Sequence, residues 1–187
     1  DASSTLPKGQ NTYRYPSING SLMLSDLIPA IKKGPLNYLK IRAADARVGA
    51  DASPYSLATT FQGQSTKFGS LPRFTLGDAI ANANLKPEIT QSKEAGFEVG
   101  FWNGRGSIDA TWYDKDTHDQ IINLNVSTAS GFSAVTVNAG DLNNQGFEGI
   151  INLTPIQRGR FEWNTTFNYS HNYETVRSLA NGLTNIP

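Results

Sequence analysis

Apolar and polar residues alternate from Phe161 to Tyr173, with Thr165 and His171 as the only less apolar members of the odd-numbered set. Side chains of a β-strand point alternately to the two faces of its sheet, so this pattern predicts a strand with one apolar face. Strands of globular proteins usually have about 5–6 residues, whereas strands that cross a membrane need about 9–11. The length of the alternation therefore favours a membrane-spanning strand.

Five further segments show a similar alternation and are predicted to be strands: residues 17–24, 39–44, 94–101, 107–113 and 148–154. Asn103-Gly104 joins two of them, and this dipeptide is typical of β-hairpins because type I′ turns need positive φ angles. A second short turn is expected at 155–159 and a compact connection at 25–37. The pattern thus predicts about six strands in three hairpins.

Long connections alternate with these short turns, at residues 50–89, at residues 117–141 and in the tail from Arg177. Outer-membrane barrels have short turns on the periplasmic side and longer loops on the extracellular side, which is the order found here. Spanning barrels have at least about eight strands, so we expect this chain to be part of a larger sheet or to contain further strands. It begins with Asp1 and has no signal peptide, so we expect both ends to be cut.

The composition agrees with a sheet that has one apolar and one polar face. Hydrophobic residues make up 38% and charged residues 17% of the chain, below the usual levels of about 45–50% and about 25%. Nine Phe, seven Tyr and three Trp argue against disorder. No apolar run of about 18 residues predicts a transmembrane helix, but barrel strands carry apolar residues only at alternate positions.

Charge and cysteine content exclude several functions. Sixteen basic and sixteen acidic residues give zero net charge without a basic patch, so we expect no nucleic-acid partner. The absence of cysteine excludes a disulfide scaffold, a thiolate metal site and a cysteine nucleophile.

A few polar residues suggest chemistry, but each has a simpler interpretation. Glu94, Glu98 and Asp109 fall on the polar faces of neighbouring strands, where they could act as acid and base or merely face water in a barrel lumen. His118 lies beside two aspartates in a predicted loop, a weak metal motif. His171 lies on the aromatic face near a strand end, as an interfacial residue would. We predict no catalytic, cofactor-binding or metal-ligating residue.

Aromatic residues near the strand ends have two interpretations. They could form a platform that stacks against sugars, or they could be girdle residues at the two membrane interfaces. The candidates for the platform are Trp102, Trp112, Tyr113, Phe161, Trp163 and Tyr173. The girdle interpretation is favoured for Phe101, Phe161 and Trp163, which flank short turns.

Three stretches carry a resemblance to a known family by their order and spacing. They are Tyr15-Pro16-Ser17-Ile18 with Leu39-Lys40-Ile41-Arg42-Ala43; Leu85-Lys86-Pro87-Glu88 followed by Ser92, Glu94 and Gly96; and Asn143-Asn144-Gln145-Gly146-Phe147-Glu148. Together they resemble the SusC/RagA family of TonB-dependent outer-membrane transporters. The stretch Ala44-Asp45-Ala46-Arg47 departs from the family, which usually has a Ser-Tyr-Gly type sequence there.

The resemblance implies that residues 1–187 form about a quarter of the wall of a 22-stranded type barrel, without the family's plug or TonB box. It implies import of a large nutrient, such as an oligosaccharide or peptide, through the bacterial outer membrane. The implied partners are a SusD-like surface lipoprotein that caps the barrel, TonB with its inner-membrane motor, and outer-membrane lipid. No enzyme activity and no cofactor are expected.

The long connection at 50–89 carries Tyr55, Phe61, Phe68 and Phe74, which are candidates for contacting cargo or the cap. Alternatively, these four side chains pack the loop onto itself. For the chain as a whole, the alternative is a soluble all-β module of the carbohydrate-binding or adhesin type. Such a module explains the aromatic residues and turns, but it does not explain the long alternation or the order of short and long connections.

Overall fold

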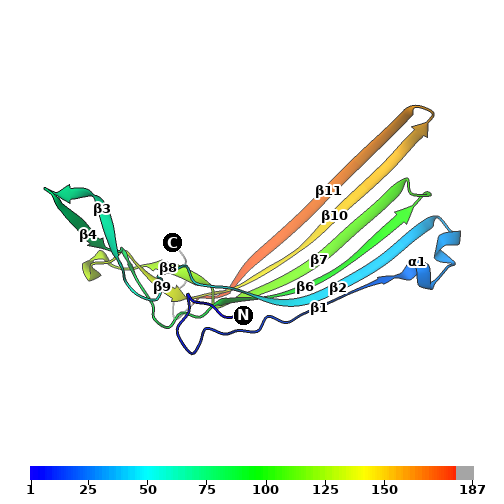
Figure 1. Cartoon of the computed structure of the whole chain (residues 1–187). Coiled ribbons are helices and arrows are strands. Elements are labelled where there is room, and N and C mark those ends of the chain that lie inside the picture. Colours follow the sequence, from blue (N-terminus) through cyan, green and yellow to red (C-terminus); the bar gives the residue numbers. More distant parts are fainter. Residues whose placement is uncertain (180–187) are drawn as a thin grey trace.

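The computed structural model describes residues 1–179, and its regular secondary structure is almost entirely β-strand (Figure 1). Six long strands lie side by side in one antiparallel sheet, in the order β1-β2-β6-β7-β10-β11. They are β1 (Ser17–Met23), β2 (Leu36–Ala50), β6 (Glu88–Phe101), β7 (Gly106–His118), β10 (Asp141–Arg158) and β11 (Phe161–Ser178). The predicted all-β fold with antiparallel up-and-down strands is confirmed.

Most strands extend beyond the alternation that predicted them, chiefly towards the long loops. Pairing of β2 with β6 continues to Ala50 and Glu88, and pairing of β6 with β7 continues to Ile89 and His118. Both faces are polar in this region, so the sequence pattern fades although the backbone ladder continues. Because β11 runs to Ser178, the predicted tail from Arg177 begins later than expected, and residues 180–187 lie outside the described residues.

The short connections join the strands at the end of the sheet opposite the long loops (Figure 1). Between β6 and β7, the Arg105 amide donates to the Trp102 carbonyl at 3.2 Å. Asn103 and Gly104 between them have φ angles of 55° and 85°, so the predicted hairpin at this dipeptide is confirmed. A one-turn helix α1 (Leu24–Leu27) and a 3-10 turn η1 (Ile31–Lys33) connect β1 to β2.

The short turn predicted at 155–159 is present but shorter than expected, because β10 continues to Arg158 and only Gly159 and Arg160 separate it from β11. Pro155 has no N–H for the ladder, but it lies at a register shift between Leu153 and Ile156, where a bulge accommodates it. The Arg105 side chain donates to the Pro155 carbonyl at 2.7 Å and so satisfies the bulged backbone.

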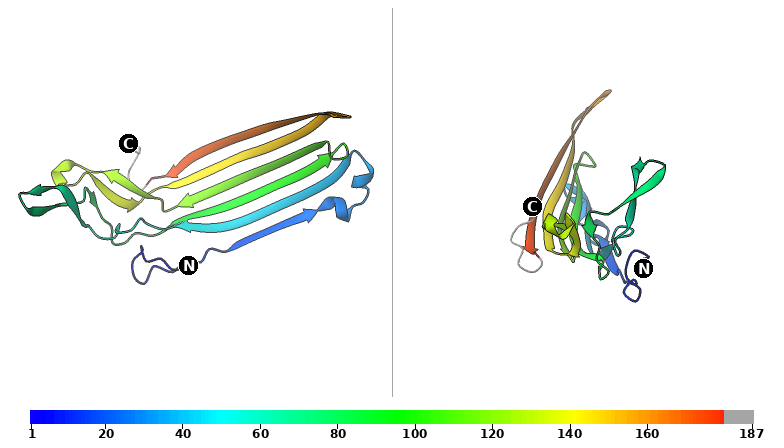
Figure 2. Two further views of the ribbon diagram at one scale, coloured as in Figure 1. Left: turned by 45° about the horizontal axis from the view of Figure 1, so that its top comes forward. Right: turned by 90° about the vertical axis from the view of Figure 1, so that its left-hand side faces the viewer.

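The two long connections form structured loops at the other end of the sheet. The first contains the hairpin of β3 (Phe61–Phe68) and β4 (Leu71–Leu76), which projects away from the sheet in Figures 1 and 2. The long connection predicted at 50–89 therefore contains two strands of its own. The loops also contribute β5 (Ala79–Ile80), β8 (Ile121–Asn125), a 3-10 turn η2 (Thr128–Ser130) and β9 (Ala134–Asn138). These three strands form a sheet in the order β5-β9-β8.

Both faces of the large sheet are largely accessible, and the apolar core described here lies at the loop end. Leu6, Ala52 and Leu85 are buried together, and Tyr13, Leu57 and Ile121 pack against them. This loop-end core joins the N-terminal segment to both long loops. Among residues 1–179 no helix is long and apolar enough to cross a membrane.

Candidate functional site

The strand register separates the large sheet into an apolar and a polar face. Val99, Ile108, Ile151 and Phe167 lie directly opposite one another on β6, β7, β10 and β11. Since side chains alternate along each strand, residues two positions away share this apolar face. It carries all eight positions that the alternation assigns to one side: Phe97, Val99, Ile108, Ala110, Ile151, Leu153, Phe167 and Tyr169.

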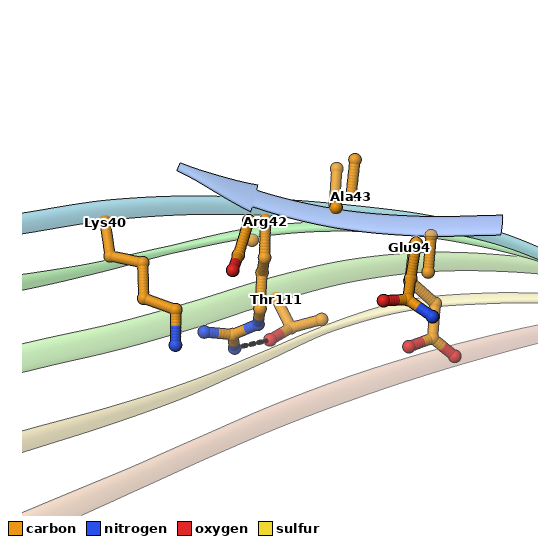
Figure 3. A pocket seen from close by; sticks show the side chains of 11 residues that line it. Lys40, Arg42, Ala43, Glu94 and Thr111 are labelled. Carbon is orange, nitrogen blue, oxygen red and sulfur yellow. Dashed lines mark hydrogen bonds between the residues drawn. The ribbon is translucent and has the colours of Figure 1, made fainter. Parts of the chain in front are cut away.

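The opposite, polar face carries a ladder of charged side chains. Lys40, Glu98 and Asp109 lie opposite one another, and Arg42 and Thr111 lie one step further along the same face. Figure 3 shows the side chains of Lys40, Arg42, Glu94 and Thr111 on one side of the sheet and that of Ala43 on the other.

The side chain of Arg42 on β2 reaches across the intervening strand β6 and binds two residues of β7. Its Nη2 donates to Asp109 Oδ1 and to Thr111 Oγ1, both at 2.6 Å. The strand that it crosses presents Gly96, and an added Cβ there would lie 3.0 Å from Arg42 Nε. The glycine therefore leaves the space through which the guanidinium reaches Asp109.

The three carboxylates noted in the sequence share this polar face, and each has a hydrogen-bond donor. Tyr38 donates to Glu98 at 3.2 Å, Ser92 donates to Glu94 at 3.1 Å, and Arg42 holds Asp109. This arrangement can bind polar or ionic groups along the face. No group of three or more His, Asp or Glu suited to a metal ion lies within the described residues.

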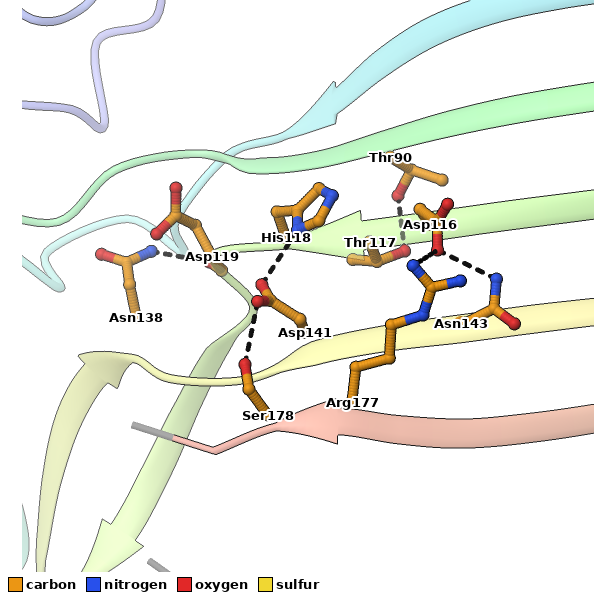
Figure 4. Close-up of polar contacts among 10 residues, drawn as sticks. All are labelled: Thr90, Asp116, Thr117, His118, Asp119, Asn138, Asp141, Asn143, Arg177 and Ser178. Carbon is orange, nitrogen blue, oxygen red and sulfur yellow. Dashed lines mark hydrogen bonds and ion pairs between the residues drawn. The ribbon is translucent and has the colours of Figure 1, made fainter. Parts of the chain in front are cut away.

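A second polar cluster ties β7, β10 and β11 together where the strands meet the long loops (Figure 4). His118 Nδ1 lies 3.0 Å from Asp141 Oδ1, and Ser178 Oγ donates to Asp141 Oδ2 at 2.8 Å. These hydrogen bonds lower the pKa of Asp141 below its usual value, and the bond from Ser178 has the largest effect. Nearby, Arg177 pairs with Asp116 at 3.0 Å. His118 is thus part of a structural cluster that anchors the loops.

Hydrogen bonds from side chains and backbone also link the two long loops to each other. The Ile121 amide donates to Glu88 Oε1 at 2.7 Å, and Asn138 Nδ2 donates to the Lys86 carbonyl at 2.8 Å. The Ser133 amide donates to the carbonyl of Asp78 at 2.9 Å. Sequence analysis missed these contacts, because residues far apart in the chain make them and no local pattern marks them.

All four aromatic candidates of the first long loop are exposed, with accessible fractions of 81% for Tyr55, 73% for Phe61, 82% for Phe68 and 61% for Phe74. The interpretation that they pack the loop onto itself is therefore wrong. Phe61 lies opposite Leu76, and Phe74 lies opposite Gly63, so they form one apolar face of the β3–β4 hairpin. Phe68 lies near the hairpin tip, whereas Tyr55 precedes the hairpin in the chain.

Comparison with known proteins identifies the family. The model of the TonB dependent receptor-like β-barrel matches residues 12–187. The chain belongs to this family. It is 36% identical over 118 residues to the TonB-dependent receptor SusC of Bacteroides thetaiotaomicron. This match covers 62% of this chain and 12% of that protein. It is also 28% identical over 183 residues to a TonB-dependent receptor of Formosa agariphila, covering 96% of this chain and 18% of the relative.

Solved structures show the same fold. The RagAB peptide importer in its closed-closed state superposes with a TM-score of 0.84 at 18% identity, over 97% of this chain and 20% of that one. The resemblance to the SusC/RagA group is confirmed by these matches. The chain spans less than a fifth of the length of the curated relatives it matches.

Proposed function

We propose that this chain is part of the barrel wall of a TonB-dependent transporter in a bacterial outer membrane, which imports a large nutrient such as an oligosaccharide or a peptide. Its family and its fold support this role, because SusC is a TonB-dependent receptor and RagAB is a peptide importer. By the same reasoning the wall provides no enzyme activity.

The observation that carries the proposal is an uncharged band on the apolar face. From the row of Phe101 and Gly106 to the row of Ala43 and Trp112, four consecutive rows contain no Asp, Glu, Lys or Arg. The next row contains Asp45, Lys93 and Asp114, which lie opposite one another across β2, β6 and β7. A band without charges across a wide sheet is what a lipid-facing wall requires.

The spacing of the aromatic residues at the two edges of the band agrees with a membrane. The four uncharged rows themselves cover six residue steps on β11, from Thr165 to His171. Ten residue steps separate Trp163, near the turn end, from Tyr173, which lies in the charged row. At about 3.3 Å per residue and a tilt of about 40°, this distance corresponds to a height of about 25 Å, the thickness of the apolar band of outer-membrane barrels. We assign Phe161 and Trp163 to one aromatic girdle and Trp112 and Tyr173 to the other.

The remaining features fit the same orientation. The polar face with Arg42, Asp109 and Glu98 lines the lumen, the short turns face the periplasm, and the loops near 50–89 and 117–141 face the exterior. The exposed apolar face of the β3–β4 hairpin, with Phe61 and Phe74, suits contact with a SusD-like surface lipoprotein. TonB supplies energy through other parts of a longer protein.

Deleting the gene for the full-length transporter tests this function. We expect loss of growth on one oligosaccharide or peptide source and retention of growth on its monomers, with rescue by the intact gene. Rescue should fail when TonB is absent. Growth of the deletion strain on every such polymer tested would contradict the transport role.

The soluble-module alternative has its own test. Residues 1–187 expressed alone leave β1 and β11 with unpaired edges and expose the apolar face, so we expect aggregation without detergent. A monomeric fragment with a cooperative unfolding transition in water would favour the soluble module instead.

A further inference from the structure

An open groove lies at the loop end, between the β3–β4 hairpin and the β5-β9-β8 sheet. Gln62 of β3, Asn123 of β8 and Thr136 of β9 line it, together with Asp78 and most of the segment 53–60. Gln62 alternates with Phe61 along β3, so the hairpin turns its polar face to the groove and its apolar face away from it. The groove is distinct from the polar face of the large sheet.

Backbone hydrogen bonds fix the walls of the groove. The Asn82 amide donates to the Ser56 carbonyl at 3.1 Å, and the Ser133 amide donates to the Asp78 carbonyl at 2.9 Å. The parallel pairing of β5 with β9 and the loop-end core hold the two long loops together beside it. The groove therefore exists before a ligand arrives, which lowers the entropic cost of binding.

The lining carries little charge and is rich in hydrogen-bonding groups. Besides small apolar residues it consists mainly of Ser, Thr, Asn and Gln, and Asp78 is its one charged residue among those described. Thr136 Oγ1 donates to Asn123 Oδ1 at 2.8 Å, which fixes the amide of Asn123. Tyr55 is 81% exposed at the groove and has a φ angle of 68°, a conformation unusual for a side chain of this size.

These groups match a neutral polyhydroxylated ligand. A sugar hydroxyl both donates and accepts, so it can bond to an amide N–H and to a carboxylate at the same time. The Tyr55 ring offers an apolar face with a polar tip, which suits the face of a sugar ring. The negative charge of Asp78, with no Lys, Arg or His among the described lining residues, disfavours sulfated or uronic sugars.

We propose that this groove is a subsite for neutral oligosaccharides, in which Asn123 and Asp78 hydrogen-bond sugar hydroxyls and Tyr55 stacks on a sugar ring. The inference rests on the proposed transport function and names the class of cargo that the loop end selects.

The test uses the full-length transporter in lipid nanodiscs and isothermal titration calorimetry. The probes are maltohexaose, xylohexaose and mannohexaose, with hexagalacturonate and an uncharged Gly/Ser hexapeptide for comparison. We expect at least one neutral hexaose to bind and neither comparison probe to do so. Asn123→Ala and Tyr55→Ala should each raise the Kd by about fivefold, the loss of about one hydrogen bond or one stacked ring. Asn125→Ala, an exposed position on the same strand outside the groove, should leave the Kd unchanged.

A charge reversal gives a readout that loss of folding cannot imitate. Asp78→Lys should allow hexagalacturonate to bind while weakening the neutral probe. Neutral binding that is the same in the groove variants and in wild type would overturn the groove as the site. Preference for the peptide, or no binding of any hexaose, would show that the groove does not select neutral oligosaccharides. If cells that carry the transporter still took up another polymer, the proposed transport function would stand even though the proposed ligand class was wrong.

Discussion

Arg42 binds Asp109 across the full width of strand β6, with 2.6 Å between Nη2 and Oδ1. The link depends on Gly96, because a Cβ at that position would lie 2.8 Å from the Ala110 carbonyl oxygen and 3.0 Å from Arg42 Nε. The pair is partly exposed, with side-chain fractions of 33% and 41%. Its Coulomb energy is therefore modest, and its main effect is to set the positions of both charges on the polar face.

Gly96→Ala should destabilise the full-length barrel by about 1–3 kcal/mol, the usual cost of forcing extra volume into a packed site. The backbone carbonyl of Ala110 cannot move without disturbing the ladder between β6 and β7. Gly20→Ala on β1 is the matched control, because nothing lies within 4 Å of its added Cβ. Urea unfolding in detergent micelles measures both variants, and equal midpoints would show that Gly96 has no such role.

The sequence predicts the middle of each long strand better than its ends. Alternation at Phe97, Val99 and Phe101 follows from an apolar face opposite a polar one. Towards Glu88 both faces are polar, so β6 continues without a pattern to reveal it. The length of the alternation in the sequence therefore indicates the height of the apolar band along the strands and not the full length of the strand.

The loops are less predictable, for two physical reasons. The pairing of Ala79 with Ala134 joins short segments that are distant in sequence, and no local preference encodes it. The β3–β4 hairpin did have a local signal, since Gly69 and Ser70 form a two-residue connection between Phe68 and Leu71. The exposure of Tyr55 and Phe61 was left open by the sequence, because burial depends on neighbours that only the fold supplies.

Ile150 and Ile151 provide a matched test of the two faces. Ile151 lies opposite Ile108 and Phe167, near the middle of the apolar band, whereas Ile150 lies opposite Asp109 on the polar face. Ile151→Arg should destabilise the full-length barrel in lipid by about 2–4 kcal/mol. Ile150→Arg should change stability by less than about 1 kcal/mol, because its charge faces water and a carboxylate. The free energy of unfolding is measured by urea titration of the barrel refolded into lipid vesicles. Equal losses of stability in the two variants would reject the assignment of the faces.

Asp141 should make stability depend on pH at the loop end, outside the apolar band. Hydrogen bonds from Ser178 and His118 lower its pKa from the usual 3.8 in the folded state. Its contribution to stability is thus fully present above pH 3.8 and is lost as the pH falls through the lower, folded-state pKa. Asp141→Asn should lower the urea midpoint at pH 7, and the difference from wild type should shrink under strongly acidic conditions. A difference that stays constant down to acidic pH would contradict this assignment.

The most direct test of the barrel-wall orientation is cysteine labelling of the full-length transporter in intact cells with a membrane-impermeant maleimide. Single cysteines replace Ser65 of β3, Asn125 of β8 and Arg160 of the β10–β11 turn, all of which are exposed. Arg160 is preferable to Gly104, whose φ of 85° would strain any side chain. Cysteines at positions 65 and 125 should react in intact cells, and that at 160 should react only after the outer membrane is permeabilised. Labelling at position 160 in intact cells, with protection at the other two, would contradict the proposed orientation of the wall and its loops.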